Sequence, residues 1–293
     1  MNNKLSLQEW IDQAEREGVS FTDFCLRHQS GCLEKKPAEL VDYMLSVLDV
    51  MDQSIATGLS GVKSRGGLVG GDARRLADYS DRQADKSIVG PTVGRAVAMA
   101  LAVGEANAAM GKIVAAPTAG SSGVLPAVLF ALGESRGSAR TELAKALVVA
   151  GAIGMVIASR ASLAGAAGGC QAECGSAGAM AAGAAVAMSG GSPRQVGHAV
   201  AITLKNMLGL VCDPVAGLVE VPCVKRNAGA AAQAMIAADM ALADIQSVIP
   251  VDEVIDAMAA VGASMSCSLK ETSQGGLAVT PTALILADKL LQG

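Results

Sequence analysis

The sequence is poor in aromatic and in charged residues. Of its 293 residues, 2% are aromatic and 17% are charged, compared with about 25% charged in an average globular domain. The formal net charge is −4, so the chain does not have the basic balance of a typical nucleic-acid-binding protein. With so few aromatic rings, stacking of bases on a protein surface is equally disfavoured. We therefore expect no nucleic-acid partner.

Long apolar runs and export signals are also missing. The longest apolar run extends from Ala146 to Ala158, between Lys145 and Arg160, and is shorter than the about 20 residues that a membrane span needs. We interpret it as a buried core helix and expect no membrane association. The N-terminal residues lack the apolar stretch and cleavage site of a secretory signal, which predicts a cytoplasmic protein. Seven cysteines in such a chain favour free thiols, metal ligands or a catalytic thiol over a disulfide framework.

Small residues are abundant. The chain has 55 alanines and 34 glycines, and a core built from them must bring backbones close together. Strand signals are few, because β-branched and aromatic residues do not alternate over more than a few positions. We therefore predict an all-α fold of tightly packed, Ala/Gly-rich helices. Glycine inside a helix costs up to about 1 kcal/mol relative to alanine, so its frequency needs a packing or functional reason.

Composition divides the chain into three stretches. Residues 1–60 have apolar residues at helical spacing, which predicts an N-terminal helical cap. Residues 61–90 form a glycine-rich loop or lid region. Residues 91–293 have helix-sized runs of small residues, which predict a helical domain. We expect the three stretches to form one continuous domain.

The glycine-rich run from Gly58 to Gly71 predicts a mobile loop. It is either a linker that follows the cap or a lid that closes over an anionic substrate. In the second interpretation, the cationic side chains of Lys63 and Arg65 belong to the lid.

Three of the seven cysteines have settings that suit a metal or a reactive thiol. Cys170 precedes a run that predicts a helix, and the positive end of a helix dipole lowers the pKa of a thiol there. Cys212 and Cys223 flank a segment in which Pro214 and Pro222 exclude a regular helix. Three such thiolates are able to hold a zinc ion, or a [4Fe–4S] cluster with one iron free of protein. The residues alone do not decide between these two.

The other cysteines carry weaker signals. Cys25 and Cys32 lie in the cap with polar neighbours, which favours an incidental role. Cys174 lies one helical turn after Cys170, where it is either an alternate ligand or an inert small side chain. Cys267 precedes a polar run, and its neighbours assign it no role.

Five motifs, in order, resemble the α subunit of the iron–sulfur-dependent L-serine dehydratases over nearly the whole chain. They are Ala-Pro-Thr-Ala-Gly-Ser-Ser-Gly (116–123), Gly-Cys-Gln-Ala-Glu (169–173), Leu-Gly-Leu-Val-Cys-Asp-Pro-Val (208–215), Val-Pro-Cys-Val-Lys-Arg-Asn-Ala (221–228) and Lys-Glu-Thr-Ser-Gln-Gly-Gly-Leu-Ala (270–278). The resemblance implies a helical lyase of amino-acid degradation and gluconeogenesis that converts L-serine to pyruvate and ammonia without pyridoxal phosphate. It also implies that Cys170, Cys212 and Cys223 hold a [4Fe–4S] cluster whose remaining iron acts as a Lewis acid on the serine hydroxyl. The alternatives are the same chemistry on L-threonine or L-cysteine, and a non-catalytic helical scaffold that binds zinc.

The motifs also supply candidates for binding the substrate. The loop with Thr118, Ser121 and Ser122 precedes an apolar run, and a loop at a helix N-terminus offers N–H groups to an anion such as the serine carboxylate. The other interpretation of this loop is a serine N-cap and nothing more. Lys270 and Thr272 in the last motif are further candidates for contacting substrate.

The base that removes the Cα proton is not identified by the sequence. The candidates are Lys112, Lys270 and His198, because a lysine near a cluster can have a lowered pKa and histidine titrates near neutrality. His198 has small apolar neighbours, where a packed or solvent-facing imidazole is the simpler interpretation. Asn206 and Asn227 lie close in sequence to the cysteines and are candidates for orienting ligands or substrate.

The chain departs from the resembled family in two ways. Single-chain members have an additional N-terminal region with a Ser-Ser-His-Thr substrate motif, which two-subunit members carry on a β chain; the motif is absent here. We therefore expect a separate β subunit that completes the site and supplies part of its chemistry. Some single-chain members also end in a cysteine that caps the free iron, whereas this chain ends at Gly293 without one, so the iron is expected to be open to water or substrate.

Overall fold

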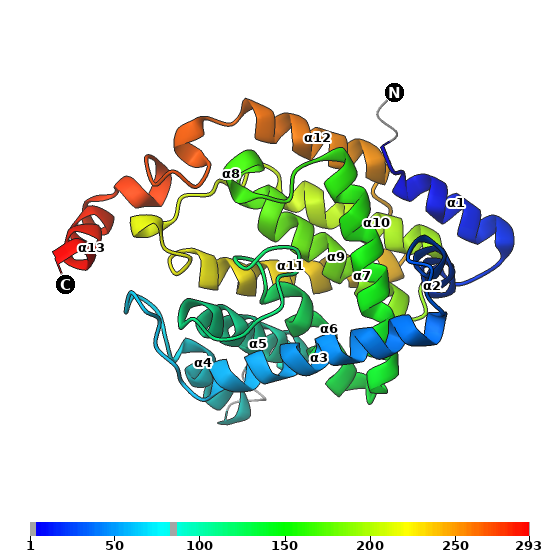
Figure 1. The fold of residues 1–293 in the computed structure, drawn as a ribbon, viewed down its shortest axis with the longest axis horizontal. Helices are drawn as coiled ribbons and strands as arrows, with labels where there is room; N and C mark the ends of the chain where they lie inside the picture. Colours follow the sequence, from blue (N-terminus) through cyan, green and yellow to red (C-terminus); the bar gives the residue numbers. More distant parts are fainter. Residues whose placement is uncertain (1–3, 83–86, 293) are drawn as a thin grey trace.

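The computed structural model describes residues 4–82 and 87–292. This part of the chain contains thirteen α-helices and no β-strand, with only two isolated β-bridges (Figure 1). The helices are α1 (Leu7–Glu17), α2 (Phe21–Cys32), α3 (Pro37–Leu59), α4 (Asp72–Arg82), α5 (Gly90–Ala108), α6 (Val124–Arg136), α7 (Arg140–Arg160), α8 (Gly165–Gly168), α9 (Ser176–Met188), α10 (Pro193–Met207), α11 (Cys223–Leu242), α12 (Val251–Ser264) and α13 (Pro281–Gln292). The predicted all-α fold is confirmed.

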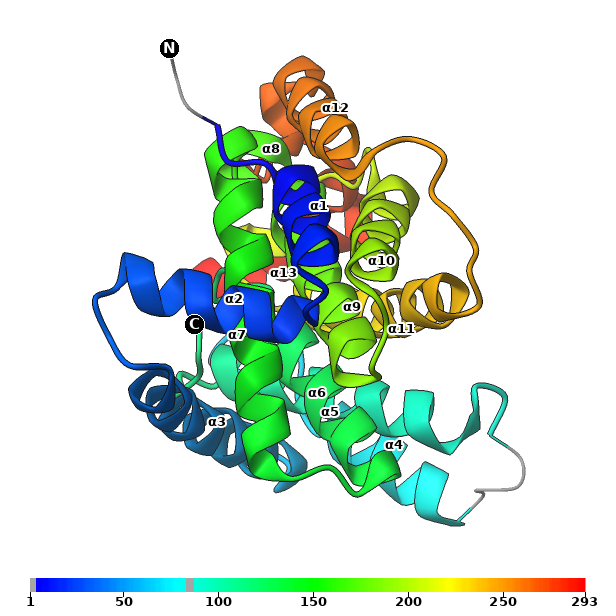
Figure 2. The same cartoon turned by 90° about the vertical axis from the view of Figure 1, so that its right-hand side faces the viewer.

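Helix α9 forms the centre of the core. It packs against α6, α7, α10 and α11, and Figure 2 shows it enclosed by its neighbours. Every residue from Ser176 to Val186 is buried. A helix that is apolar on all sides is stable in this way only when other helices surround it.

Small side chains allow the helices to approach closely. A Cβ placed on Gly58 of α3 would lie 1.9 Å from the carbonyl oxygen of Ala102 in α5. A Cβ on Gly183 of α9 would lie 2.3 Å from the Cδ1 atom of Ile153 in α7. At both crossings glycine is required by contact between helices, which accounts for its use inside helices despite the propensity cost.

Helix α7 contains the long apolar run and crosses the bundle beside α2, α3 and α9. By length and composition alone it is the one helix of the described residues that would be able to cross a membrane, with a mean hydropathy of 1.7 in its most apolar window. However, 67% of that window is buried by other parts of the chain. It therefore has the surroundings of a core helix, as the sequence predicts.

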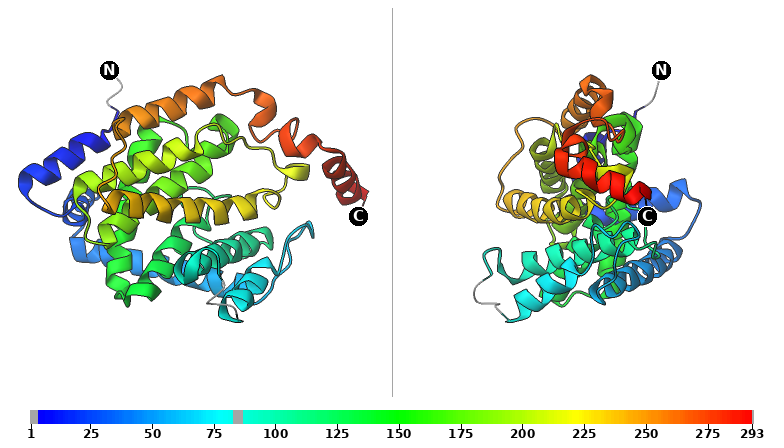
Figure 3. Two further views of the ribbon diagram at one scale, coloured as in Figure 1. Left: turned by 180° about the vertical axis from the view of Figure 1, so that it is seen from behind. Right: turned by 90° about the vertical axis from the view of Figure 1, so that its left-hand side faces the viewer.

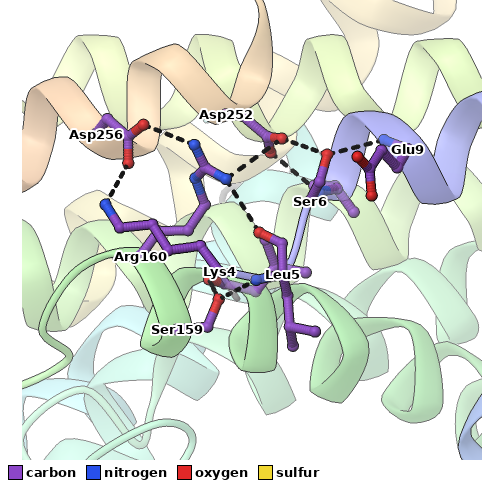
Figure 4. A network of polar contacts seen from close by, with 10 residues as sticks. Lys4, Leu5, Ser6, Glu9, Ser159, Arg160, Asp252 and Asp256 are labelled. Carbon is purple, nitrogen blue, oxygen red and sulfur yellow. Dashed lines mark hydrogen bonds and ion pairs between the residues drawn. The ribbon is translucent and has the colours of Figure 1, made fainter. Parts of the chain in front are cut away.

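The three N-terminal helices spread over the surface of the bundle. Helix α1 packs on α10, α2 on α7, and α3 on α5 and α7. A polar network fixes the start of α1 to the end of α7 and the start of α12 (Figure 4). In it Arg160 donates to the Leu5 carbonyl at 3.1 Å and pairs with Asp256 at 2.6 Å, while Asp252 accepts from Ser6 Oγ at 2.6 Å. The predicted cap is thus joined to later helices by specific contacts.

Three segments far apart in sequence gather at one end of the molecule. Figures 1 and 3 show the loop before α4, the loop before α11 and helix α13 projecting on the same side. They border a depression of about 630 Å³, whose lining includes Arg65, Ala119, Leu218 and Leu290. Residues 83–86 of the predicted lid region 61–90 lie outside the described residues, and α4 occupies part of the remainder.

Candidate active site

Cys170, Cys212 and Cys223 are all buried, with exposed fractions of 2%, 4% and 9%. Cys170 directly precedes a π-helical turn, η2 (Gln171–Gly175), which continues into α9. Cys212 lies on the irregular segment after α10, and Cys223 is the first residue of α11. Two of the three thiols therefore begin helices, and π-helical turns of this kind are frequent at functional sites.

Hydrogen bonds join the segments of Cys170 and Cys212. The Gln171 N–H donates to the Leu210 carbonyl at 2.9 Å, and the Gln171 side chain accepts from the Gly209 N–H at 2.9 Å. Because Gln171 is almost fully buried, these bonds hold the loop before Cys212 against the turn that begins at Cys170.

The three thiols influence one another electrostatically. Burial raises the pKa of Cys212, and negative charge on Cys170 raises it further. The same two causes raise the pKa of Cys223 to about 12. The pKa of Cys170 is lowered, because the Cys174 thiol donates a hydrogen bond to it and the Arg226 guanidinium attracts its negative charge, which together outweigh burial. The largest cause of the lowered pKa is the hydrogen bond from Cys174.

Arg226 supplies positive charge next to these thiols. It forms an ion pair with the buried carboxylate of Asp213 at 2.8 Å and donates to the Val211 carbonyl at 2.8 Å. Its own pKa is raised by the negative charges of Cys170 and Asp213, despite desolvation. The side chain therefore connects α11 to the Cys212 segment and balances negative charge at the thiols.

The last motif also lies against Cys212. The Cys212 N–H donates to the Leu269 carbonyl at 2.9 Å and its carbonyl accepts from the Glu271 N–H at 2.7 Å, which forms a bridge opposite Lys270. Lys270 is half-buried, whereas Thr272 is exposed and donates to the Cys267 carbonyl. Cys267 itself is exposed.

The loop from Thr118 to Gly123 leads directly into α6, as the sequence predicts. Its three hydroxyls bond within the protein. Thr118 Oγ1 donates to Glu173 and lies 3.0 Å from Ser121 Oγ, and Ser122 Oγ donates to the Ala119 carbonyl at 2.7 Å. Among the described residues, the N–H groups of Ala119, Gly120 and Ser121 donate to no protein acceptor. Ser121 is fully buried, so the accessible donors are those of Ala119 and Gly120. The loop therefore offers backbone donors to an anion, and its hydroxyls hold the loop in shape.

Asn227 fixes this loop to α11. Its amide group donates to the carbonyls of Gly120 at 2.6 Å and Cys223 at 2.9 Å, and its oxygen accepts from the Gly123 N–H at 2.9 Å. Asn227 is buried. Asn206, the other asparagine that the sequence singled out, is exposed at the end of α10.

Glu173 is a site residue that the sequence analysis missed. A Cβ on Gly120 would lie 2.5 Å from Glu173 Oε1, and a Cβ on Gly165 would lie 3.3 Å from Glu173 Oε2 and 3.0 Å from the Cys212 sulfur. The carboxylate thus lies between the loop before α6 and Cys212. Burial raises the pKa of Glu173, although the Thr118 hydrogen bond lowers it, and the charge of Glu271 adds to the increase. One signal was available, because Glu173 is the only charged residue between Arg160 and Arg194.

Two of the candidate bases lie on other surfaces. Lys112 is exposed and lines a depression with Asp49 and Asp52 of α3. His198 lies on α10 in a depression with Gln246 and Val248, and its Nδ1 accepts from the Ser247 N–H at 3.3 Å. Desolvation and nearby cations lower the pKa of His198. Of the three candidates, Lys270 is the one whose segment bonds to a cysteine of the site.

The glycine-rich loop is anchored, in contrast to the mobile loop that its composition suggested. The buried carboxylate of Glu220 accepts from Ser64 Oγ at 2.5 Å, from the Gly66 N–H at 2.8 Å and from the Leu68 N–H at 3.0 Å. A second buried carboxylate, that of Glu105, accepts from three consecutive N–H groups at the start of α4. Glycine content could not reveal these two distant acceptors. Lys63 and Arg65 are both exposed, and Arg65 borders the depression at the end of the molecule.

No three His, Cys, Asp or Glu side chains of residues 4–82 and 87–292 converge so that they could hold a single metal ion. The thiols of Cys170, Cys212 and Cys223 therefore do not converge on one point, although negative charge on Cys170 raises the pKa of both other thiols.

A family model for the serine dehydratase alpha chain matches residues 3–278. The chain belongs to this family. It is 52% identical over 288 residues to the "Probable L-serine dehydratase, alpha chain" of Bacillus subtilis (strain 168), which covers 98% of this chain and 95% of that protein. It is 45% identical over 276 residues to the L-serine dehydratase, alpha chain, of Peptoniphilus asaccharolyticus, which covers 94% of each. The resemblance stated from the motifs is confirmed at the level of the family.

Longer relatives also match. The L-serine dehydratase of Mycobacterium tuberculosis (strain CDC 1551 / Oshkosh) is 40% identical over 286 residues, which cover 94% of this chain but 61% of that protein. The matched region of this relative is therefore joined to additional sequence that the present chain does not match.

Proposed function

We propose that this chain is the α subunit of a lyase that converts L-serine to pyruvate and ammonia and does not need pyridoxal phosphate. The observation that carries the proposal is the gathering of three buried thiols beside a loop with free N–H donors. The family supports the substrate, because the relatives from Bacillus subtilis and Peptoniphilus asaccharolyticus bear the name L-serine dehydratase.

The thiols of Cys170, Cys212 and Cys223 would hold a [4Fe–4S] cluster. The donor set fits this group, because all three are buried thiols and thiolate is the usual ligand of such clusters. Arg226 would offset part of the negative charge of the bound cluster. When bound, the cluster would supply a Lewis-acidic iron for the hydroxyl of serine.

The residues of the chain would bind and orient the substrate. The N–H groups of Ala119 and Gly120, which are accessible and have no protein acceptor, would bind the serine carboxylate at the N-terminal end of α6. Asn227 and Thr118 would keep this loop in position through their hydrogen bonds. Lys270 would lie near the substrate from the bridge opposite Cys212, and removal of the Cα proton would fall to it or to a group of the partner subunit.

We propose a separate β chain as that partner. Two relatives of nearly equal length are named alpha chains, and the Mycobacterium tuberculosis relative carries further sequence beyond the matched part. A partner polypeptide would supply what this additional sequence supplies in the longer protein.

The decisive experiment uses the chain co-purified with its β chain under anaerobic conditions. We expect a brown protein with iron and sulfide in near-equal amounts that releases pyruvate from L-serine and loses activity in air. Cys170→Ser should remove both colour and turnover, whereas Cys32→Ser, at an exposed thiol in α2, should preserve both. A colourless wild-type complex with stoichiometric zinc and no pyruvate formation would refute the proposal. Ratios of kcat/KM for L-serine, L-threonine and L-cysteine define the substrate, because one methyl group changes selectivity by about 10- to 200-fold.

A further inference from the structure

Glu173 has an unusual position for a partly buried carboxylate. Its hydrogen-bond partner in the described residues is the Thr118 hydroxyl, and no lysine, arginine or histidine of those residues forms an ion pair with it. By contrast, Glu105 and Glu220 each accept hydrogen bonds from three donors. A carboxylate that is partly withdrawn from water without a cationic partner provides a site that attracts a cation.

The free donors of the neighbouring loop lie next to this carboxylate. Glu173 Oε1 is close to the Cα atom of Gly120, since a Cβ there would be 2.5 Å away. Gly120 and Ala119 are also the accessible residues of this loop whose N–H groups have no protein acceptor. Anion-binding donors and a cation-binding acceptor are therefore adjacent, with only the glycine backbone between them.

An α-amino acid matches this arrangement. Its carboxylate and its ammonium group are attached to the same carbon, so a site that recognises both needs donors and an acceptor side by side. The other carboxylate oxygen of Glu173, Oε2, lies near Gly165, and so does the Cys212 sulfur. An amino acid bound here would therefore direct its side chain towards the thiols. We propose that Glu173 binds the α-ammonium group of the substrate while the accessible N–H groups of Ala119 and Gly120 bind its carboxylate. This inference rests on the proposed function insofar as the substrate is an amino acid.

The test compares ligands that differ in the ammonium group alone. L-Alanine and propionate share the carboxylate and the methyl group, and neither has a leaving hydroxyl, so calorimetric dissociation constants are measurable without turnover. In the complex with the β chain, Glu173→Gln should raise the dissociation constant of L-alanine by about 10- to 150-fold. This corresponds to the about 1.5–3 kcal/mol of a charge-assisted hydrogen bond. Propionate binding should change less than about threefold, since its contacts with the loop remain. The KM for L-serine should rise in parallel with the dissociation constant of L-alanine.

Two further variants control for folding and for charge. Glu173→Asp keeps the charge and should retain part of the preference for L-alanine over propionate. Glu134→Gln removes an exposed carboxylate at the far end of α6 and should leave both constants unchanged. If Glu173→Gln weakened the binding of L-alanine and of propionate equally, the proposal would be overturned. Glu173 would then serve only to hold the loop in its conformation. If the wild-type complex binds L-alanine through Glu173 but releases no pyruvate from L-serine, the assignment of Glu173 stands and the proposed reaction fails.

Discussion

Asn227 offers the sharpest test of how the site is held together. It is 1% exposed and forms three hydrogen bonds, which connect the Cys223 turn of α11 to the loop before α6. Asn227→Ala removes all three, at about 1 kcal/mol of net stability each. Alanine in a helix interior recovers about 0.5 kcal/mol relative to asparagine. The free energy of unfolding should therefore fall by about 2.5 kcal/mol.

This loss translates into a measurable change of the melting temperature. For 293 residues, an unfolding entropy of about 2.1 cal/mol/K per residue gives roughly 0.6 kcal/mol/K, so Tm should fall by about 4 °C. Asn206→Ala is the matched control, because Asn206 is exposed in α10 and its replacement should change Tm by less than about 1 °C. Calorimetry on both variants makes the comparison.

A second substitution separates the donor and acceptor roles of Asn227. Asn227→Asp keeps an acceptor for the Gly123 N–H but turns a carboxylate towards the carbonyls of Gly120 and Cys223. It should destabilise at least as much as alanine at neutral pH and recover partly in acid. In both variants the loop would shift, and kcat/KM for L-serine should fall by roughly 10²-fold. Equal melting temperatures for the Asn227→Ala and Asn206→Ala proteins would refute the reasoning.

Three other predictions follow from packing, anchoring and charge. Gly58→Ala places a Cβ 1.9 Å from a carbonyl oxygen of α5 and should lower the free energy of unfolding, measured by chemical denaturation, by about 1–3 kcal/mol. Gly151→Ala, whose Cβ would have no atom within 4 Å, should not destabilise the protein. A similar loss of stability in both variants would contradict the close crossing of α3 and α5. Glu220→Gln removes an acceptor for the 64–68 loop, so amide exchange and proteolysis there should accelerate, and unchanged protection would argue against the anchor. Partial burial raises the pKa of Asp256, but hydrogen bonds from Arg160 and Lys4 outweigh it and lower the pKa below its usual value. The carboxylate therefore stabilises the fold above about pH 4 and loses this effect as pH falls through the lowered pKa. The Tm difference between wild type and Asp256→Asn should accordingly shrink from about pH 6 to below about pH 4, and a constant difference would exclude the pair as its cause.

The carboxylates of the chain illustrate how surroundings assign different roles to one chemical group. Glu105 and Glu220 are buried, and each holds a loop backbone through more than one N–H group. Glu173 is only partly buried and keeps most of its accepting capacity free. The number of donors around each carboxylate therefore separates structural glutamates from the one available to a ligand.

The sequence by itself determined the helical class and the family, and it singled out the cysteines on which the proposed site rests. Small residues in helix-sized runs leave no alternative to close helix packing, because they lack the volume to fill a wider space. The setting of Cys170 before a helix and the prolines around Cys212 and Cys223 are local properties that a linear chain displays directly. The motifs also identify the family, since they are stretches of consecutive residues.

Only the tertiary structure decided which side chains share the site. Cys170 and Cys212 are 42 residues apart in sequence, and the contact between their segments depends on the packing of α9 and α10 and on the hydrogen bonds of Gln171. The same packing carries Lys112 and His198 to other surfaces and gives Asn227, but not Asn206, a buried role. Local patterns encode whether a segment is helical and which of its residues prefer burial. Hydrogen-bond partners that are distant in sequence are set by the complete three-dimensional arrangement.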